Sequence, residues 1–179
     1  DGTQYMLPYY FSKTLMVYNK KLFEEAGVAG PPQSFDELLD AAYKIKETGE
    51  GRTGFVTLNF DWLYWPLMAM NGIELLNEDM TEAAFNTPEM VDVVTRLAQA
   101  TTDGAINPIS WTGRWVEPNN AFAAGDIGMY QAHGAALFWI MGQADWANAD
   151  TLGVAEWPGG WGVPNAHGLG ISASTNYPD

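Results

Sequence analysis

The chain has 179 residues, of which 47% are hydrophobic and 17% are charged. This composition supports one packed domain and excludes a wholly disordered chain. Eight Lys and Arg residues stand against 22 Asp and Glu residues, which gives a formal net charge of −14 at pH 7. Because a polyanion repels phosphate backbones, we expect no nucleic-acid partner. The sequence contains no cysteine, which excludes disulfides, thiolate metal sites and cysteine nucleophiles.

Strand and helix patterns alternate along the chain. Short apolar runs predict strands at 4–8, 14–18, 54–58, 127–131, 151–155 and 169–172. Helical patterns occupy 20–26, the segment from the cap Ser34 to Gly49, the segment from Trp62 to Gly72, the segment from the cap Thr87 to just before Gly104, 120–124 and 135–141. This order predicts one α/β domain, without internal repeats, in which helices cover both faces of a sheet.

Sequence signals for catalysis and cofactor binding are nearly absent. The chain has no phosphate-binding G-x-x-x-x-G-K-[ST] loop, no dinucleotide-binding G-x-G-x-x-G after a strand, and no G-x-S-x-G nucleophile turn. Its two histidines, His133 and His167, lack the spacing of zinc ligands. We therefore expect no cofactor, no metal site and no enzymatic activity.

Aromatic residues are abundant and many fall in predicted loops. The chain has eight Trp, eight Tyr and eight Phe, together 13% of its residues. Five of the tryptophans stand beside or near Gly, Pro, Asn or Asp: Trp62, Trp111, Trp115, Trp157 and Trp161. Flat rings stack on the C–H faces of sugars, while nearby polar groups bind the hydroxyls. The pattern predicts a carbohydrate-binding surface built from loops.

Several segments, taken in order, resemble the extracellular solute-binding proteins of carbohydrate ABC importers, the maltose-binding-protein-like group. No single segment is specific, but their order and spacing together are. These segments are DGTQY at 1–5, YNKKLFEEAG at 18–27, PPQSFDEL at 31–38, WPL at 65–67, NG at 71–72, AFNTPE at 84–89, AFAAGDIGM at 121–129 and GLGISAS at 168–174.

The resemblance implies one lobe of a periplasmic-binding-protein-like fold, with a mixed sheet flanked by helices. Such proteins have two α/β lobes joined by chain crossovers, and they close on a ligand between the lobes. Residues 1–179 would form the second lobe alone, with crossovers near 10–14 and 174–178. The resemblance further implies a missing first lobe, a sugar or oligosaccharide ligand, importer membrane subunits as partners, and a periplasmic or cell-surface location.

Asp61 and Trp62 open the helix that follows the strand at 54–58. In the family this loop faces the cleft and supplies an acid and a stacking ring. A helix cap at Asp61 and a hydrophobic staple at Trp62 are the alternative. We expect Tyr64 and Trp65, on the same turn, to fill the core and leave Trp62 free for a ligand.

Two further candidates lie at the first crossover and in the loop before 120–124. Tyr10 and Ser12 follow Pro8 at the place where family members often put a ligand-contacting polar group, with ordinary hinge packing as the alternative. Trp115, and less so Trp111, could offer a stacking platform or cover a small satellite core.

His133 follows the strand at 127–131, where the maltose binders of the family have a Gly-Pro-Trp turn. Ala135 and Ala136 replace that Pro and Trp here, so a stacking ring is lost and a maltose-like ligand is less expected. His133 could donate to a hydroxyl, or serve the fold alone.

The last candidates lie in the glycine-rich stretch that in the family approaches the ligand through backbone amides. They are Trp161, His167 and Gly168, and Trp161 could replace the ring lost at Ala136. An exposed loop in which Trp161 covers nothing is the alternative.

Two other functions remain open at this point. A glycan hydrolase would need two carboxylates, and Asp61, Glu117 and Asp126 are the candidates. A binder of polyamines or other cations would suit the acidity, although acidic side chains more often form a solvated surface.

Overall fold

The computed structural model describes residues 6–177. The strands are β1 (Leu7–Asn19), β2 (Thr53–Val56), β3 (Ile127–His133), β4 (Leu152–Ala155) and β5 (Pro164–Leu169). The α-helices are α1 (Lys20–Glu25), α2 (Phe35–Glu47), α3 (Tyr64–Met70), α4 (Pro88–Thr102), α5 (Val116–Ala123) and α6 (Gly134–Gln143). Short 3-10 helices are η1 (Asp61–Leu63), η2 (Pro108–Trp111) and η3 (Pro158–Gly160). Within the described range, no helix combines the length and apolar character that a membrane span requires.

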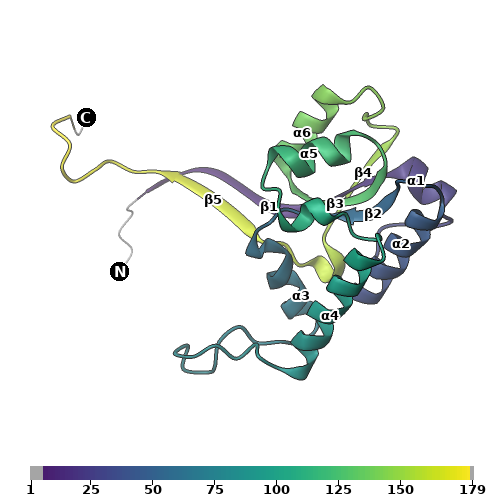
Figure 1. Ribbon diagram of the computed structural model, residues 1–179. Helices are drawn as coiled ribbons and strands as arrows, with labels where there is room; N and C mark the ends of the chain where they lie inside the picture. Colours follow the sequence, from purple (N-terminus) through teal and green to yellow (C-terminus); the bar gives the residue numbers. More distant parts are fainter. Residues whose placement is uncertain (1–5, 178–179) are drawn as a thin grey trace.

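The strands form a mixed sheet in the order β2-β3-β1-β4 (Figure 1). β2 and β3 are parallel, whereas β1 is antiparallel to both β3 and β4. Val17 in the central strand faces Tyr130 on one side and Val154 on the other. The predicted α/β class, with a mixed sheet flanked by helices, is therefore confirmed.

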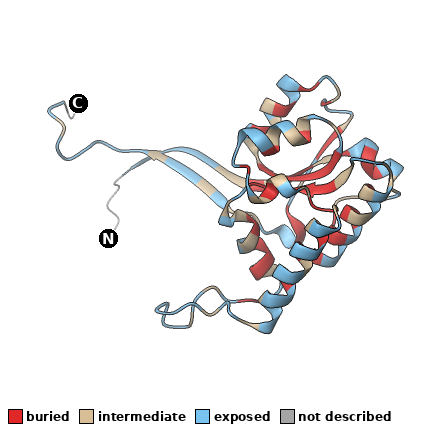
Figure 2. Cartoon of the chain, in the orientation of Figure 1, coloured by how far each residue is buried: buried red, intermediate tan, exposed pale blue. Residues whose placement is uncertain are grey.

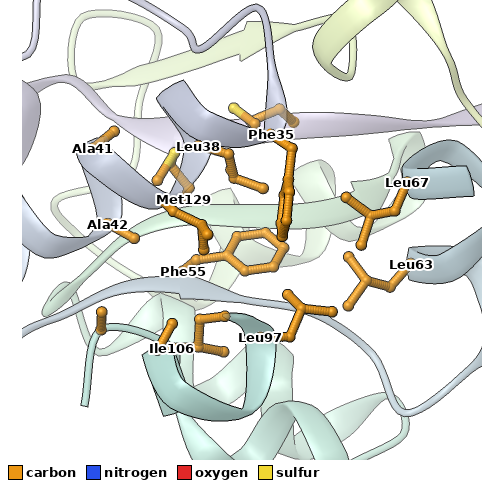
Figure 3. Packing of buried hydrophobic residues seen from close by; sticks show 14 of the residues in the cluster. Phe35, Leu38, Ala41, Ala42, Phe55, Leu63, Leu67, Leu97, Ile106 and Met129 are labelled. Carbon is orange, nitrogen blue, oxygen red and sulfur yellow. The ribbon is translucent and has the colours of Figure 1, made fainter. Parts of the chain in front are cut away.

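Successive residues of β2 and β3 point to opposite faces of the sheet, and each face has its own core. Phe55 and Met129 belong to the first core, which α1, α2, η1, α3 and α4 cover. Figure 3 shows Phe55 between Leu63, Leu67 and the residues of α2. Val56, Tyr130 and their neighbours form the second core beneath α5 and α6. Helices thus cover both faces, as the alternation of strands and helices predicted.

The outer half of β1 leaves the body of the molecule and pairs with β5 as a two-stranded arm (Figure 1). Leu7 pairs with Leu169 at its tip and Lys13 with Pro164 at its base. Figure 2 shows the arm mostly in the colour of exposed residues. The prediction of two separate strands at 4–8 and 14–18 was wrong, because β1 continues without a break through residues 9–13; residues 4 and 5 lie outside the described range.

Other element boundaries differ in ways that pairing and capping explain. The strand predicted at 169–172 was wrong, since β5 ends at Leu169 and owes its position to the pairing with β1. α5 begins at Val116, earlier than the predicted 120. Ser34 caps α2 as predicted, accepting from the Glu37 amide at 3.1 Å. In a standard capping box the Glu37 carboxylate would accept from the Ser34 amide, but here it accepts from the preceding Gln33 amide at 2.8 Å.

Two of the tryptophans assigned to loops belong to the interior. Trp157 is 1% exposed and lies against Phe55, with their ring centroids 5.8 Å apart. Its Nε1 is buried without a hydrogen-bond partner. Trp111 packs half-buried against the same core and donates from Nε1 to Thr101 Oγ1 at 2.9 Å. Trp157 therefore lies in a loop as predicted, between β4 and η3, but its ring belongs to the core and not to a ligand-binding surface.

Candidate functional site

The parallel pairing of β2 and β3 brings two predicted site segments to one edge of the sheet. Because the two strands run in the same direction, their carboxyl ends meet at that edge. β2 continues through Leu58 into η1, which carries Trp62, and β3 ends at His133. The rings of Trp62 and His133 lie edge to face with centroids 6.4 Å apart.

Two more rings complete what we call the aromatic cluster: Phe60, Trp62, Trp115 and His133. Trp115 lies 5.6 Å from Trp62 and 5.4 Å from His133 by ring centroids, edge to face in both pairs. Phe60 stacks on Trp62 at 5.3 Å and tilts against Trp115 at 4.9 Å. Trp62 is half-buried against the second core, whereas 41% of Trp115 is exposed. The structure thus unites three of the predicted residues and adds Phe60.

Hydrogen bonds hold the bases of these loops together. The buried Gln131 side chain donates to the Trp62 carbonyl oxygen at 3.0 Å and accepts from Thr57 Oγ1 at 2.7 Å. The Asn59 amide donates to the Gly113 carbonyl oxygen at 2.9 Å, which connects the Trp62 loop to the loop that carries Trp115. Hydrogen bonds therefore fix the loops that carry Trp62 and Trp115 to each other and to β3.

His133 is both a cluster member and the cap of α6. Its Nδ1 accepts from the Ala135 amide at 3.3 Å, so the neutral ring carries its proton on Nε2. Burial lowers the pKa of His133 below the ordinary 6.5, because burial disfavours the charged imidazolium. At neutral pH the residue can offer one N–H donor beside two indole rings.

Asp61 is exposed and accepts from Trp65 Nε1 at 3.0 Å. The expectation that Trp65 fills the core was wrong, since 45% of this residue is exposed. Trp65 lines two cavities. One, of about 390 Å³, is lined by Asp61, Tyr64, Met68, Leu75, Phe85 and Met90. The other, of about 280 Å³, is lined by Pro66, Ala69, Trp161, Gly162, Val163 and Pro164.

Trp161 is half exposed and lies beside Trp65 in the second cavity. Ala136, where a ring is lost, lies in the first turn of α6 and is buried in the second core. The ring that lies against His133 at this turn is Trp115, and in the described chain Trp161 has no ring contact with the cluster. Trp161 therefore belongs with Trp65 and does not substitute for the missing ring.

The four other predicted residues lie on the arm. The rings of Tyr10 and His167 are 5.3 Å apart across β1 and β5. Ser12 faces Asn165 in the same ladder, and its hydroxyl donates to the Lys13 carbonyl oxygen at 3.4 Å. Gly168 pairs with Pro8. A Cβ at Gly168 would approach Met6 Cε to 2.7 Å, an overlap that rotation of the Met6 side chain can relieve.

Sequence reasoning missed Arg114, which adds a positive charge to the cluster. Its guanidinium carbon lies 5.4 Å above the Phe60 ring, a cation–π contact. In residues 6–177 no carboxylate lies within ion-pair distance of this guanidinium. The backbone amide of Arg114 donates to Glu117 Oε2 at 3.3 Å. The position between Trp111 and Trp115 was the only signal in the sequence.

The model of the family "bacterial extracellular solute-binding protein" matches residues 1–179. The chain belongs to this family. A binding protein of Brucella abortus is 35% identical over 133 residues, which cover 72% of this chain and 32% of that protein. The sn-glycerol-3-phosphate-binding periplasmic protein UgpB of Agrobacterium fabrum is 30% identical over 141 residues, covering 72% of this chain and 31% of UgpB.

Solved structures of the same family resemble the whole fold. An ABC transporter solute-binding protein of Thermotoga lettingae, bound to α-D-tagatose, superimposes with a TM-score of 0.80 at 26% identity, covering 97% of this chain and 46% of that one. The GacH receptor of Streptomyces glaucescens, solved with acarbose, gives 0.79 at 26% identity, covering 98% and 46%. The chain spans about a third of the curated relatives and just under half of these structures.

Proposed function

We propose that this chain is one lobe of a two-lobed solute-binding protein of an ABC importer, and that its aromatic cluster holds a sugar, oligosaccharide or polyol. One observation carries the proposal: Trp62, Trp115 and His133, separated by up to 71 positions in the sequence, converge at the carboxyl edge of β2 and β3. Ligands of open α/β sheets bind at this edge.

The chemistry of the cluster suits a polyhydroxylated ligand. Trp115 offers an accessible indole face to the C–H groups of a sugar ring. The Nε2–H of His133, the guanidinium of Arg114 and the carboxylate of Asp61 supply donors and an acceptor for hydroxyls. Trp65 and Trp161 would extend the surface for a longer ligand.

The arm would be the crossover to a first lobe, as expected for segments near 10–14 and 174–178. Exposed apolar side chains on the arm and just beyond β5 include Leu7, Phe11, Leu169 and Ile171, and the first lobe would cover such side chains in the complete protein. Tyr10, Ser12, His167 and Gly168 would then border the cleft. Ligand would favour the closed arrangement by contacting both lobes. The membrane subunits of the importer would then recognise the closed protein on the outer side of the membrane.

The two rival functions fit the geometry less well. Asp126 precedes β3, whereas Asp61 lies beyond the carboxyl end of the neighbouring parallel strand. A seven-residue strand separates these ends by about 20 Å. Glycosidase carboxylates lie about 5–9.5 Å apart, so Asp61 and Asp126 cannot form such a pair. A polyamine would meet the positive charge of Arg114 beside the cluster. These observations favour a binding protein over a hydrolase built on Asp61 and Asp126 and over a polyamine binder.

A fluorescence screen of the full-length protein tests the function. We define the test panel as D-tagatose, D-mannitol, maltose and acarbose, with spermidine and sn-glycerol 3-phosphate as comparisons. Saturable tryptophan quenching by a panel member, without a hydrolysis product in the same sample, is the expected result. Tight spermidine binding, sugar turnover, or no binding by any panel member would contradict the proposal.

Trp62→Ala and Trp115→Ala locate the site. Each should weaken binding of the tightest panel member about tenfold or more, since each removes one wall of the cluster. Trp146→Phe is the matched control, because Trp146 contacts Phe122 and donates to the Ala123 carbonyl oxygen near the opposite edge of the sheet. It should reduce fluorescence and leave the affinity unchanged.

A further inference from the structure

Gln131 is a polar residue in the interior of β3. It is 1% exposed, and the strand residues on either side of it, Tyr130 and Ala132, belong to the second core. Burying a carboxamide costs free energy unless its polar atoms find partners. A leucine or methionine would avoid that cost at the same volume. A glutamine at this buried position is therefore expected only if its hydrogen bonds do something that an apolar side chain cannot.

Both ends of the Gln131 side chain are engaged. Its oxygen accepts from Thr57 Oγ1 at 2.7 Å, and its nitrogen donates to the Trp62 carbonyl oxygen at 3.0 Å. The Thr57 amide in turn donates to the buried Ser110 Oγ at 3.1 Å. The carboxamide thus connects the strand that ends at His133 to the backbone of the loop that carries Trp62.

Gln131 and His133 are two residues apart on β3, so their side chains leave the strand on the same face. One of them contacts the Trp62 backbone and the other contacts the Trp62 ring. Two points of attachment fix both the position and the direction of the indole relative to β3. A single ring contact would leave the loop free to rotate about it.

We propose that Gln131 is a positioning residue for the binding site: its buried carboxamide holds the Trp62 loop so that the indole stays edge-on to His133 and Trp115. The consequence for ligand affinity rests on the function proposed above. The effect on ring geometry belongs to the ligand-free protein and does not depend on that function.

Gln131→Met tests the proposal, since methionine keeps the length and volume of the side chain and loses both hydrogen bonds. In the full-length protein, wild type should give a nuclear Overhauser effect between the Trp62 and His133 rings, and Gln131→Met should lose it. Affinity for the tightest panel member should fall about tenfold, because the indole would no longer be held in the position that the ligand requires. A retained ring contact at wild-type intensity would overturn the proposal.

Thr57→Val is the matched control. It removes the hydroxyl that donates to Gln131 but leaves the bond from Gln131 to the Trp62 carbonyl oxygen. It should lower the melting temperature and change affinity less than about twofold, since the contact that fixes Trp62 remains. A tenfold loss of affinity in Thr57→Val would mean that general loosening explains the result, and the proposal would fail.

A double-mutant cycle with Trp62→Ala separates the positioning role of Gln131 from the ligand-binding role of Trp62. If Gln131 acts through the indole, Gln131→Met should have no further effect on affinity in the Trp62→Ala background. An additive loss would overturn the positioning role. If Trp62→Ala alone leaves affinity unchanged, the proposed function fails, and the ring contact in the ligand-free protein still decides the role of Gln131. Should Gln131→Met not fold, wild type must show a slowly exchanging Gln131 side-chain amide near Trp62, and its absence would contradict the proposal.

Discussion

Gly54→Ala perturbs the contact on which the first core depends. Gly54 is buried in β2, where α2 crosses the strand. A Cβ placed on Gly54 would lie 2.1 Å from the Ala42 Cα and 2.2 Å from the Ala42 carbonyl oxygen. These are backbone atoms of a helix, so no side-chain rotation can relieve the overlap.

The size of the effect follows from these distances. Carbon atoms in ordinary contact are about 3.5–4.0 Å apart, so α2 would have to move roughly 1.5 Å away from β2. Overpacking a core costs about 1–3 kcal/mol, and more where the backbone has to shift. We expect Gly54→Ala to reach the upper end, about 3 kcal/mol, and to lower the melting temperature by about 6–12 °C in a domain of this size.

Thermal unfolding followed by far-UV circular dichroism measures this shift. Gly30→Ala is the control, because a Cβ on Gly30 meets no atom within 4 Å and the residue does not require a positive φ. Its melting temperature should equal that of wild type or rise slightly. If Gly54→Ala melted within about 2 °C of wild type, the close packing of α2 on β2 would be refuted.

Three further predictions concern single side chains. The imidazole of His133 should titrate by NMR with a midpoint below 6.5, because burial lowers its pKa. The unfolded chain then takes up the proton more readily than the folded chain. The contribution of His133 to the free energy of unfolding is therefore lost as the pH falls below 6.5. A midpoint at or above 6.5 would contradict its half-buried position. Trp157→Ala should lower the free energy of unfolding in urea by about 3–5 kcal/mol, and Trp157→Phe by less, since phenylalanine keeps a ring against Phe55 and removes the unpaired N–H. Asp61→Ala should red-shift Trp65 fluorescence by freeing its indole N–H to water, whereas Asp61→Asn, which keeps an acceptor, should not.

Local signals in the sequence predicted the elements that depend on neighbouring residues. Ser34 and Thr87 cap α2 and α4 as expected, because a cap needs only the amides two or three positions ahead. The strand at 54–58 and the loop that follows it were also predicted, since a buried run ending in Asn-Phe-Asp-Trp contains its own stop signal. These features required no knowledge of the rest of the fold.

The continuity of β1 and the position of β5 could not be predicted in the same way. Ser12 and Lys13 interrupt the apolar pattern and separate the two runs that the sequence presents as strands. Their strand conformation comes from the ladder that pairs Lys13 with Pro164, about 150 residues later. The same holds for the aromatic cluster: Trp62, Trp115 and His133 were candidates one by one, and only the parallel pairing of β2 with β3 brings two of these segments together.

The tryptophans show most directly why neighbouring residues do not decide burial. Trp157 and Trp161 flank the same Pro-Gly-Gly sequence, yet the first is 1% exposed and the second 50% exposed. Gly159 and Gly160, which lie between the two tryptophans, adopt positive φ angles and form a sharp turn. Such a turn can aim an indole toward the sheet as readily as toward solvent. Trp157 is buried because the chain leaving β4 passes over Phe55. The packing of the loop against the rest of the fold therefore decides whether its tryptophan is available to a ligand. Trp65 is the opposite case, because it was predicted to fill the core and is exposed on the first turn of α3.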